Sequence, residues 1–400
     1  MKHYIVLLLS LIAVYIYIYA PPLQFVPFGL DKLILCFSFL YITFKKRWYR
    51  FYRRFSKELF LLFLIAICSL FIYIIHREDS ILLKYDVLLL LEVLICPYAL
   101  FVYFEEKNRI CLDKELIITA IIASVVSVFL LLNPQLAYDI KNNILKFPED
   151  LIDKFLYRGY GISDGLLFSY PVILGFCASF LLLGFYKNKF NIVFILLLFL
   201  SILANARSGL VPVFVGSLIL LLFDIKRFVK LSSFIAVTVI VFSGVIVAFM
   251  SDNVIVDAAF QWGMSTFDIL GDFLSGEQSE NVEVLLNDMV VWPTTFHEYI
   301  VGSGRYLFTG YNVNTDVGYF LRLNYGGVLY LLFWLQLLIF MFRRLFHLNK
   351  LVALLLFISL LYLNYKSDFF VVNPASRFFF MVYVLCVLDV KSFSHQKSLS

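Results

Sequence analysis

Charged side chains are scarce in this sequence, and their scarcity limits what the protein can be. Aspartate, glutamate, lysine and arginine make up 15% of its 400 residues, against about 25% in ordinary globular domains. Hydrophobic residues make up 62% of the chain, which leaves too few polar groups to cover a soluble surface. This composition excludes a cytosolic enzyme, a nucleic-acid-binding protein and a secreted disulfide-rich domain, and it indicates an all-α polytopic membrane protein.

Cysteines and common catalytic motifs are also rare or missing. Of the six cysteines, all but Cys111 lie in apolar stretches, and Cys111 lies in a basic connection. The outer loops therefore have no disulfide framework. The sequence has no phosphate-binding, dinucleotide-binding or zinc-binding motif, and no Asp-x-Asp pair on the outer face. Nothing in it requires a metal or another cofactor.

Long apolar runs are abundant. Tyr4–Ala20 and Leu59–Ile75 carry no charge, and each is about long enough to cross the ~30 Å hydrocarbon layer as a helix. Pro21 and Pro22 follow the first run and disfavour signal-peptide cleavage, so we expect this run to remain as the first span. The same criteria predict about 12 transmembrane helices, at residues 4–20, 25–44, 59–75, 85–104, 116–133, 164–186, 190–206, 209–223, 231–250, 317–342, 351–364 and 376–390.

The distribution of lysine and arginine predicts the orientation of these spans. The connection at residues 45–57 holds seven basic residues, and each connection on the same side holds at least two. With the two ends of the chain included, 21 of the 33 lysines and arginines fall on this side. We therefore expect both termini in the cytoplasm and the alternate connections on the opposite face.

Two outer connections are larger than the others. The smaller lies near residues 133–163. The larger, residues 251–316, separates nine spans (1–250) from the last three and a short tail (317–400). Loops of this length in compact proteins are usually functional or disordered. The apolar residues in this one argue against disorder, and we expect short helices on the membrane surface.

The larger loop has a single basic residue, Arg305, among ten acidic ones. Arg305 directly follows Gly302-Ser303-Gly304, where the backbone is able to approach a ligand closely. Bare amides beside a guanidinium suit an oxyanion. An anion site and a purely structural turn are both compatible with this pattern.

Further cations belong to the same face. Arg207 occupies the tight hairpin between the seventh and eighth spans, Arg322 lies inside the tenth span, and Lys366 and Arg377 flank the last outer connection. An arginine within a span costs at least a few kcal/mol unless it has a partner or a watery cavity. We therefore expect Arg207 and Arg322 to face the bundle or a bound anion. The alternative is pairing with Asp316 or Asp368, or extension to the headgroups.

Two stretches together resemble a known family. In the first, an apolar helix ends in Arg207-Ser208-Gly209. In the second, the large loop ends in a Gly-x-Gly patch ahead of a helix that contains Gly326-Gly327. This arrangement resembles the O-antigen polymerase and O-antigen ligase superfamily, in detail over roughly residues 190–345. Ligases typically place a histidine just ahead of the tenth-helix equivalent, where this sequence has Asp316. That departure is more typical of the polymerase (Wzy) branch.

The resemblance implies a GT-C-like glycosyltransferase bundle in the bacterial inner membrane, active on the periplasmic face and independent of metal. Such an enzyme moves a growing glycan from one undecaprenyl diphosphate onto the sugar of another lipid-linked repeat unit. Its expected partners are these lipid-linked units, membrane lipid and a separate chain-length regulator, with no nucleic acid. Arg207 matches the superfamily's essential arginine.

The residues of the outer face suit this chemistry. Guanidinium groups bind a diphosphate bidentately and stabilise the charge that develops on it as it leaves. We assign Arg207 and Arg305 to the diphosphate, with Arg322 in support and Arg377 as a further candidate.

The acceptor hydroxyl needs a general base. Asp316, Glu298 and His297 are the candidates, in that order.

Three other functions are compatible with the sequence. An O-antigen ligase would transfer chains to lipid A–core, a repeat-unit flippase would move them across the membrane, and a structural subunit would only dock partners through the large loop. Transporters usually contain internal repeats with a site near the midplane. This chain has no convincing duplication, and its polar residues gather on one face, which disfavours a flippase.

Overall fold

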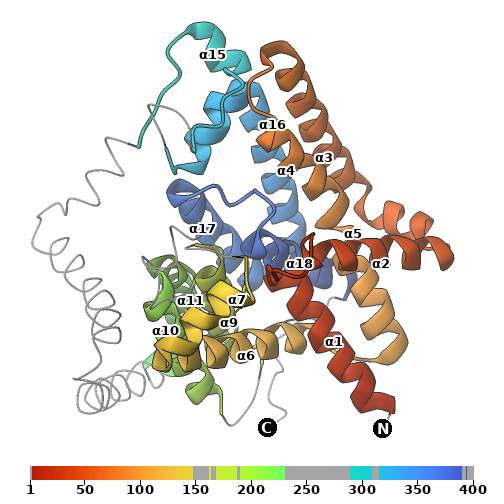
Figure 1. Ribbon diagram of the computed structural model, residues 1–400, viewed down its shortest axis with the longest axis vertical. Coiled ribbons are helices and arrows are strands. Elements are labelled where there is room, and N and C mark those ends of the chain that lie inside the picture. Colours follow the sequence, from red (N-terminus) through yellow and green to blue (C-terminus); the bar gives the residue numbers. More distant parts are fainter. Residues whose placement is uncertain are drawn as a thin grey trace, which may run out of the picture.

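The fold is almost entirely helical (Figure 1). In the part of the chain that it describes, the computed structural model contains no strand, and a single isolated bridge joins Leu23 to Leu145. Four helices there are long and apolar enough to cross a membrane: α3 (Trp48–His76), the run Ile81–Glu106, α6 (Leu112–Leu132) and α16 (Gly318–Leu348). The chain is therefore a helical membrane protein. The described residues are 2–146, 162–163, 168–186, 190–229, 289–308, 315–389 and 393.

Every predicted span except one coincides with a helix. Residues 231–250 lie outside the described part of the chain, as does most of the large loop, so the count of 12 spans and the GT-C-like bundle stay predictions. The run Ile81–Glu106 consists of three consecutive pieces rather than one helix. The remaining elements are α1 (Lys2–Tyr19), α2 (Leu30–Phe44), α4 (Ile81–Glu92), α5 (Ile95–Leu100), η1 (Phe101–Glu106), α7 (Pro134–Asn143), α9 (Ser169–Leu183), α10 (Asn191–Asn205), η2 (Arg207–Gly209), α11 (Leu210–Phe223), α15 (Phe296–Val301), α17 (Lys350–Lys366) and α18 (Pro374–Leu388).

The basic segment 45–57 is not the loop that its charges predicted. Helix α3 begins at Trp48, within this segment, and continues to the end of the third span with a kink at Phe55 (φ −122°, ψ 18°). Phe51 and Phe55 are buried four residues apart, whereas Tyr52 is exposed. This i, i+4 spacing gives the segment an apolar face that packs on the protein, and the basic residues occupy its other face.

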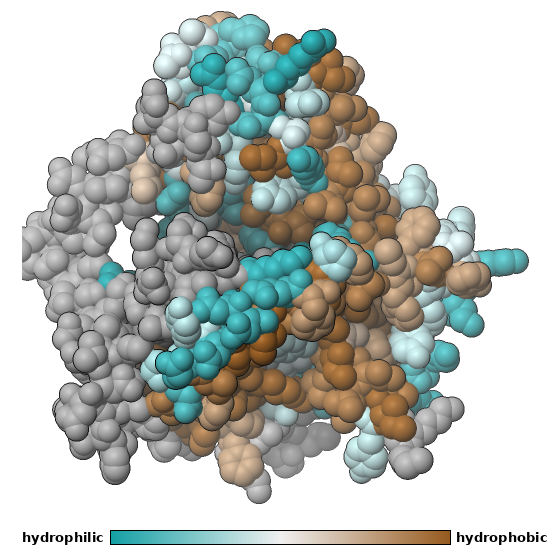
Figure 2. All heavy atoms as spheres, in the orientation of Figure 1, coloured by the Kyte–Doolittle hydropathy of each residue, from teal (hydrophilic) through white to brown (hydrophobic). Residues whose placement is uncertain are grey.

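Helices α9 and α18 form the centre of the protein. All described side chains of α9 are buried, and so are those of α18 from Pro374 to Val387. Helix α9 packs against α6, α10, α11 and α18, while α16 packs against α3 and α17, and α17 against α11. Figure 2 shows hydrophobic residues over the flank formed by α3 and hydrophilic residues around α15. The apolar flank and the polar end therefore lie on different parts of the surface.

Several contacts join segments that are far apart in the sequence but are predicted to lie on the same side of the membrane. These pairs fit the predicted alternation of the spans, whereas which face is cytoplasmic stays a prediction. On the face predicted to be cytoplasmic, Arg50 pairs with Glu106 and Arg54 donates to the Val387 carbonyl; on the outer face, Leu23 bridges Leu145 and Arg305 pairs with Glu78.

Helix α16 is broken at Gly327, which has φ 68° and ψ −172°. The break leaves the carbonyls of Asn324 and Tyr325 without their usual helical donors. The backbone N–H of Ser303 donates to the Asn324 oxygen at 2.7 Å, and that of Gly304 donates to the Tyr325 oxygen at 3.0 Å. The loop after α15 thus supplies hydrogen-bond donors to the carbonyls at the break. These bonds attach the N-terminal part of α16 to this loop.

Replacing Gly327 with alanine should destabilise the protein by about 1 to 3 kcal/mol, because only glycine adopts this backbone conformation without strain. A Cβ there would also lie 2.3 Å from the Ile300 carbonyl oxygen. The measurement is thermal unfolding in detergent, with Val328→Ala as the control at the next position, where we expect a change within about 0.5 kcal/mol. Equal melting temperatures for the two variants would contradict the account of the break.

Candidate functional site

The C-terminal end of α17 lies close to Arg207, and α17 packs against the start of α16, which follows Asp316. Lys366 ends α17 and lies close enough to Arg207 for their charges to interact. Helix α16 begins at Gly318 so close to α17 that a Cβ there would lie 2.6 Å from Asn364 Oδ1. Asp316 precedes Gly318 by two residues. Arg207 and Lys366 are therefore neighbours at this helix end, and Asp316 lies just before the helix that packs against α17.

The backbone around Arg207 is fixed by close packing. Arg207 begins the short η2 turn between α10 and α11. A Cβ on Gly209 would lie 2.4 Å from the Pro171 carbonyl oxygen of α9, so only glycine permits this approach. The sharp reversal that the sequence indicated at the seventh and eighth spans thus holds the arginine in a defined position beside α17.

Arg207 and Lys366 form a pair of neighbouring positive charges. Arg207 is half-buried, and part of the Lys366 side chain is exposed. The pKa of Lys366 lies below its ordinary value, first because its ammonium group is desolvated and second because Arg207 repels a further positive charge. An anion bound between the two cations would relieve this repulsion. The pair therefore suits a ligand with more than one negative charge.

Asp316 is placed to accept a proton. It is half-buried, and burial raises the pKa of its carboxyl group. In the described part of the chain, no hydrogen bond or ion pair to its side chain is formed. The neighbouring Tyr306 is buried and lies within electrostatic reach of Asp316 and Asp368, and its own pKa is raised, chiefly by burial. A carboxylate with a raised pKa and free oxygens has the properties of a general base.

Glu298 has a structural role in the same loop. Its Oε2 accepts hydrogen bonds from the backbone N–H of Thr294 at 2.9 Å and from the Thr294 hydroxyl at 2.7 Å. With Thr295 it forms a capping box at the start of α15. The hydrogen bonds from Thr294 are the main reason that the pKa of Glu298 is lowered. A carboxylate stabilised in its ionised form is a weaker base, which favours Asp316 over Glu298.

His297 is exposed, and its ring centroid lies 6.4 Å from that of His76. No described contact connects His297 to Asp316 or Arg207. Its position at the surface of α15 gives it no evident proton partner in the site.

The glycine patch beside Arg305 is not an open anion nest. The amides of Ser303 and Gly304 already donate to carbonyls of the broken α16, so they have no hydrogen left for an oxyanion. Of the two roles that the pattern allowed, the structure gives this patch the structural one. Arg305 itself lies 3.4 Å from Glu78, with exposed fractions of 52% and 41% for the two side chains. Such an exposed pair contributes little stability, so the guanidinium is accessible to a ligand.

The assignment of Arg322 to the diphosphate needs correction. Its side chain is 1% exposed. Nε and Nη2 donate to Asp368 at 3.0–3.1 Å, and Nη1 donates to the Tyr330 hydroxyl at 3.1 Å. The guanidinium also lies 4.3 Å from the Trp334 ring centroid. Arg322 therefore pairs with Asp368, one of the two alternatives, and it has no surface that a ligand is able to reach.

Arg377 is corrected for the same reason. It is 2% exposed, and its guanidinium donates to Asp31 and Glu92 at 2.6 Å each. Lys32 joins the same two carboxylates at 2.6 and 2.7 Å. Two cations and two carboxylates balance each other's charge, so this cluster connects α2, the end of α4 and α18. Asp31 and Lys32, which lie in the second predicted span, were not identified from the sequence as partners of Arg377.

The described residues contain no group of three potential metal ligands placed to hold an ion. No protein-family model matches this chain, and no curated protein matches it. The residues around the end of α17 and the resemblance over residues 190–345 are therefore the basis on which a function is proposed.

Proposed function

We propose that the protein is an O-antigen polymerase of the Wzy type. It joins oligosaccharide repeat units carried on undecaprenyl diphosphate, at the periplasmic face of the bacterial inner membrane, during lipopolysaccharide biosynthesis. The observation that supports this most is the neighbouring pair Arg207 and Lys366 at the end of α17, together with Asp316, whose carboxylate has no hydrogen-bond or ion-pair partner among the described residues. A cationic site for a leaving diphosphate and a base for an attacking hydroxyl are the two requirements of this reaction.

The reaction proceeds as a displacement at the anomeric carbon of the donor glycan. The bond between this carbon and the diphosphate oxygen breaks, and the electron pair leaves with the diphosphate. Arg207 and Lys366 stabilise the charge that develops there. The acceptor hydroxyl oxygen forms the new glycosidic bond, and its proton passes to Asp316. The lipid diphosphate already activates the sugar, so the step needs neither nucleotide nor metal.

In this proposal both termini are cytoplasmic and the α17 end faces the periplasm, as the lysine and arginine distribution predicts. The protein acts with a separate chain-length regulator. An O-antigen ligase is the nearest alternative, because it needs the same donor site, but Asp316 stands where ligases typically have histidine.

A strain that lacks this protein distinguishes the candidates. We expect its lipopolysaccharide to carry lipid A–core capped by a single repeat unit, because ligation continues while polymerisation stops. The measurement is gel electrophoresis of lipopolysaccharide, with a complemented strain as the control. Bare core would indicate a ligase, and a loss of periplasmic repeat units would indicate a flippase.

A further inference from the structure

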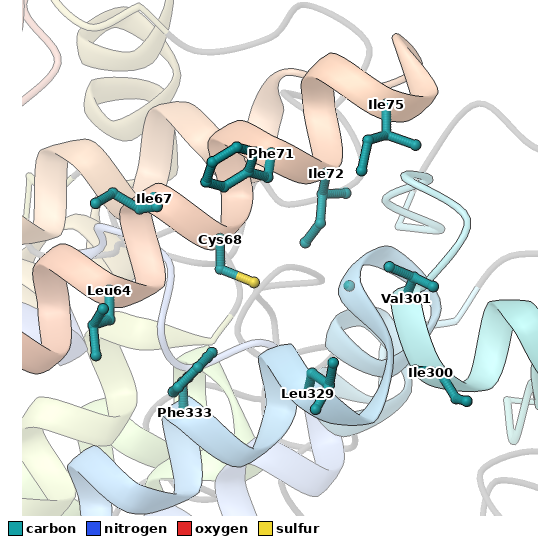
Figure 3. Close-up of a pocket in the computed structure, with 11 residues that line it drawn as sticks. Leu64, Ile67, Cys68, Phe71, Ile72, Ile75, Ile300, Val301, Leu329 and Phe333 are labelled. Carbon is teal, nitrogen blue, oxygen red and sulfur yellow. The ribbon is translucent and has the colours of Figure 1, made fainter.

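An apolar groove lies between α3 and α16, closed at one end by α15 (Figure 3). It encloses about 250 Å³. Cys68 projects into it from α3, Leu329 and Phe333 line it from α16, and Val301 borders it from α15. Its lining is almost free of polar atoms. The groove is separate from the Arg207 site and has no part in the chemistry described so far.

The groove has the length of one membrane leaflet. Its lining on α3 runs from Leu64 to Ile75, which is about 16 Å at a rise of 1.5 Å per residue. The hydrocarbon core is about 30 Å thick, so the groove covers about half of it. Both walls belong to helices long enough to span the membrane. The lining residues Phe71 and Leu329 are 59% and 52% exposed, so the groove opens to the bilayer.

Its outer end has a charged rim, in which Arg77 and Arg305 lie beside the carboxylates of Glu78 and Asp79. Directly after Ile75 come His76 and Arg77, where α3 ends in a left-handed residue with φ 53° at Arg77. Arg77 is exposed, and no described carboxylate pairs with it. Arg305 lies in the loop packed against His76, and Glu78 is its only described ion-pair partner, at 3.4 Å. Two accessible guanidiniums above an apolar groove match a lipid with one long chain and an anionic head.

We propose that this groove holds the isoprenoid chain of the acceptor substrate, and that Arg77 and Arg305 contact its diphosphate. Arg305 is thereby assigned to the acceptor diphosphate and no longer to the leaving diphosphate of the donor. The inference rests on the proposed function, in which two lipid-linked substrates must bind at once. The donor's diphosphate is the leaving group and lies at the reacting carbon, beside Arg207. The acceptor reacts at the far end of its repeat unit, so its own diphosphate lies one repeat unit away from Asp316.

Tyr306 connects the rim to the reaction centre. Its backbone N–H donates to Asp79 Oδ2 at 2.9 Å, beside the rim, and its ring lies within electrostatic reach of Asp316. Tyr306 is buried, so it links the rim to Asp316 through the interior of the protein. In this proposal the donor binds instead at Arg207 and Lys366, on other elements of the protein. This geometry keeps the two diphosphates apart, which avoids repulsion between them.

Cys68 provides a direct test, because its thiol lies in the groove. The purified protein is placed in nanodiscs of neutral phospholipid, and alkylation of each cysteine by a hydrophobic maleimide is followed by mass spectrometry. We expect geranylgeranyl diphosphate to slow alkylation of Cys68 at least fivefold without affecting the exposed Cys36. Arg77→Asn tolerates the left-handed conformation and removes the charge, and it should raise the concentration needed for protection about tenfold.

Filling the groove gives a second readout. Leu329→Trp should raise the acceptor KM at least tenfold in a polymerisation assay, whereas Leu332→Trp should leave it unchanged. Leu332 is the matched control, because both side chains are 52% exposed on α16 and only Leu329 lines the groove. A KM raised equally by both variants would contradict the proposal.

Other results overturn the proposal in distinguishable ways. Equal protection of Cys68 by phosphatidylglycerol would make the groove a site for membrane phospholipid. If geranylgeranyl diphosphate gives no protection while the protein still polymerises repeat units, the groove assignment fails and the proposed function stands. If geranylgeranyl diphosphate protects Cys68 but a strain that lacks the protein still makes full-length O-antigen, the groove is an isoprenoid site. It is then not the site of the acceptor in a polymerisation reaction.

Discussion

Replacing Arg207 with alanine should leave insertion and folding normal but, under the proposed function, should slow the joining of repeat units at least about 100-fold. This magnitude corresponds to the loss of one group that stabilises transition-state charge. Lys366 alone is left beside the leaving diphosphate, and its single ammonium group does not provide the planar fork of a guanidinium. The measurement is the rate at which undecaprenyl diphosphate is released from a lipid-linked donor.

Two variants control this experiment. Arg207→Lys keeps the charge and should recover only part of the rate, because bidentate contact is lost. Arg109 is an exposed arginine in the connection at residues 105–115, on the face predicted to be cytoplasmic, and Arg109→Ala should retain the full rate. Long glycan chains made at the normal rate by Arg207→Ala would eliminate the diphosphate assignment.

Replacing Asp316 with asparagine should lower the polymerisation rate by about 100-fold to 10,000-fold, the range expected for loss of a general base. The amide has nearly the same shape as the carboxylate but is unable to accept the proton of the acceptor hydroxyl. Glu298→Gln is the matched control. Glutamine at this position still completes the capping box of α15, so we expect a rate close to that of the unaltered protein.

The pH dependence of the reaction identifies the same base. Asp316 acts only when ionised, and burial raises its pKa above the ordinary value. The rate should therefore fall as the pH drops through this raised pKa, at a higher pH than for a solvent-exposed aspartate. In the Asp316→Asn protein, the residual rate should lose this acidic limb. An unchanged acidic limb in that variant would assign the titration to another group.

The apolar helices were predictable because hydropathy is a local property of the sequence. Apolar length alone located a helix at each predicted span that the structure describes, and residues 231–250 lie outside the described part of the chain. The same criterion was wrong for the basic segment 45–57. In this segment the basic residues lower the mean hydropathy. The spacing of Phe51 and Phe55 nevertheless gives it one apolar face, and the segment from Trp48 onward forms the first part of helix α3.

The candidate site was only partly predictable, because two of the arginines assigned to it pair instead with carboxylates far away in the chain. Arg322 and Asp368 are 46 residues apart, and Arg377 forms ion pairs with carboxylates of α2 and α4. A sequence shows that a buried arginine needs a partner, but not whether a protein carboxylate or a ligand supplies it.

Backbone contacts were harder still to predict. The sequence Gly302-Ser303-Gly304 is compatible with an anion-binding nest and equally with a structural turn. Only the break at Gly327 shows where the amides of Ser303 and Gly304 donate. Asp316 stays the proposed base, and no described partner occupies its carboxylate.

Reconstitution tests the central claim most directly. The purified protein is placed in liposomes with repeat units linked to undecaprenyl diphosphate as the only substrate, and the lipid-linked products are separated by length. The proposed function predicts a ladder of oligomers, with one undecaprenyl diphosphate released for each bond formed, and no ladder with Arg207→Ala or Asp316→Asn. A reaction that needs lipid A–core as acceptor, or repeat units that cross the bilayer without being joined, would contradict it.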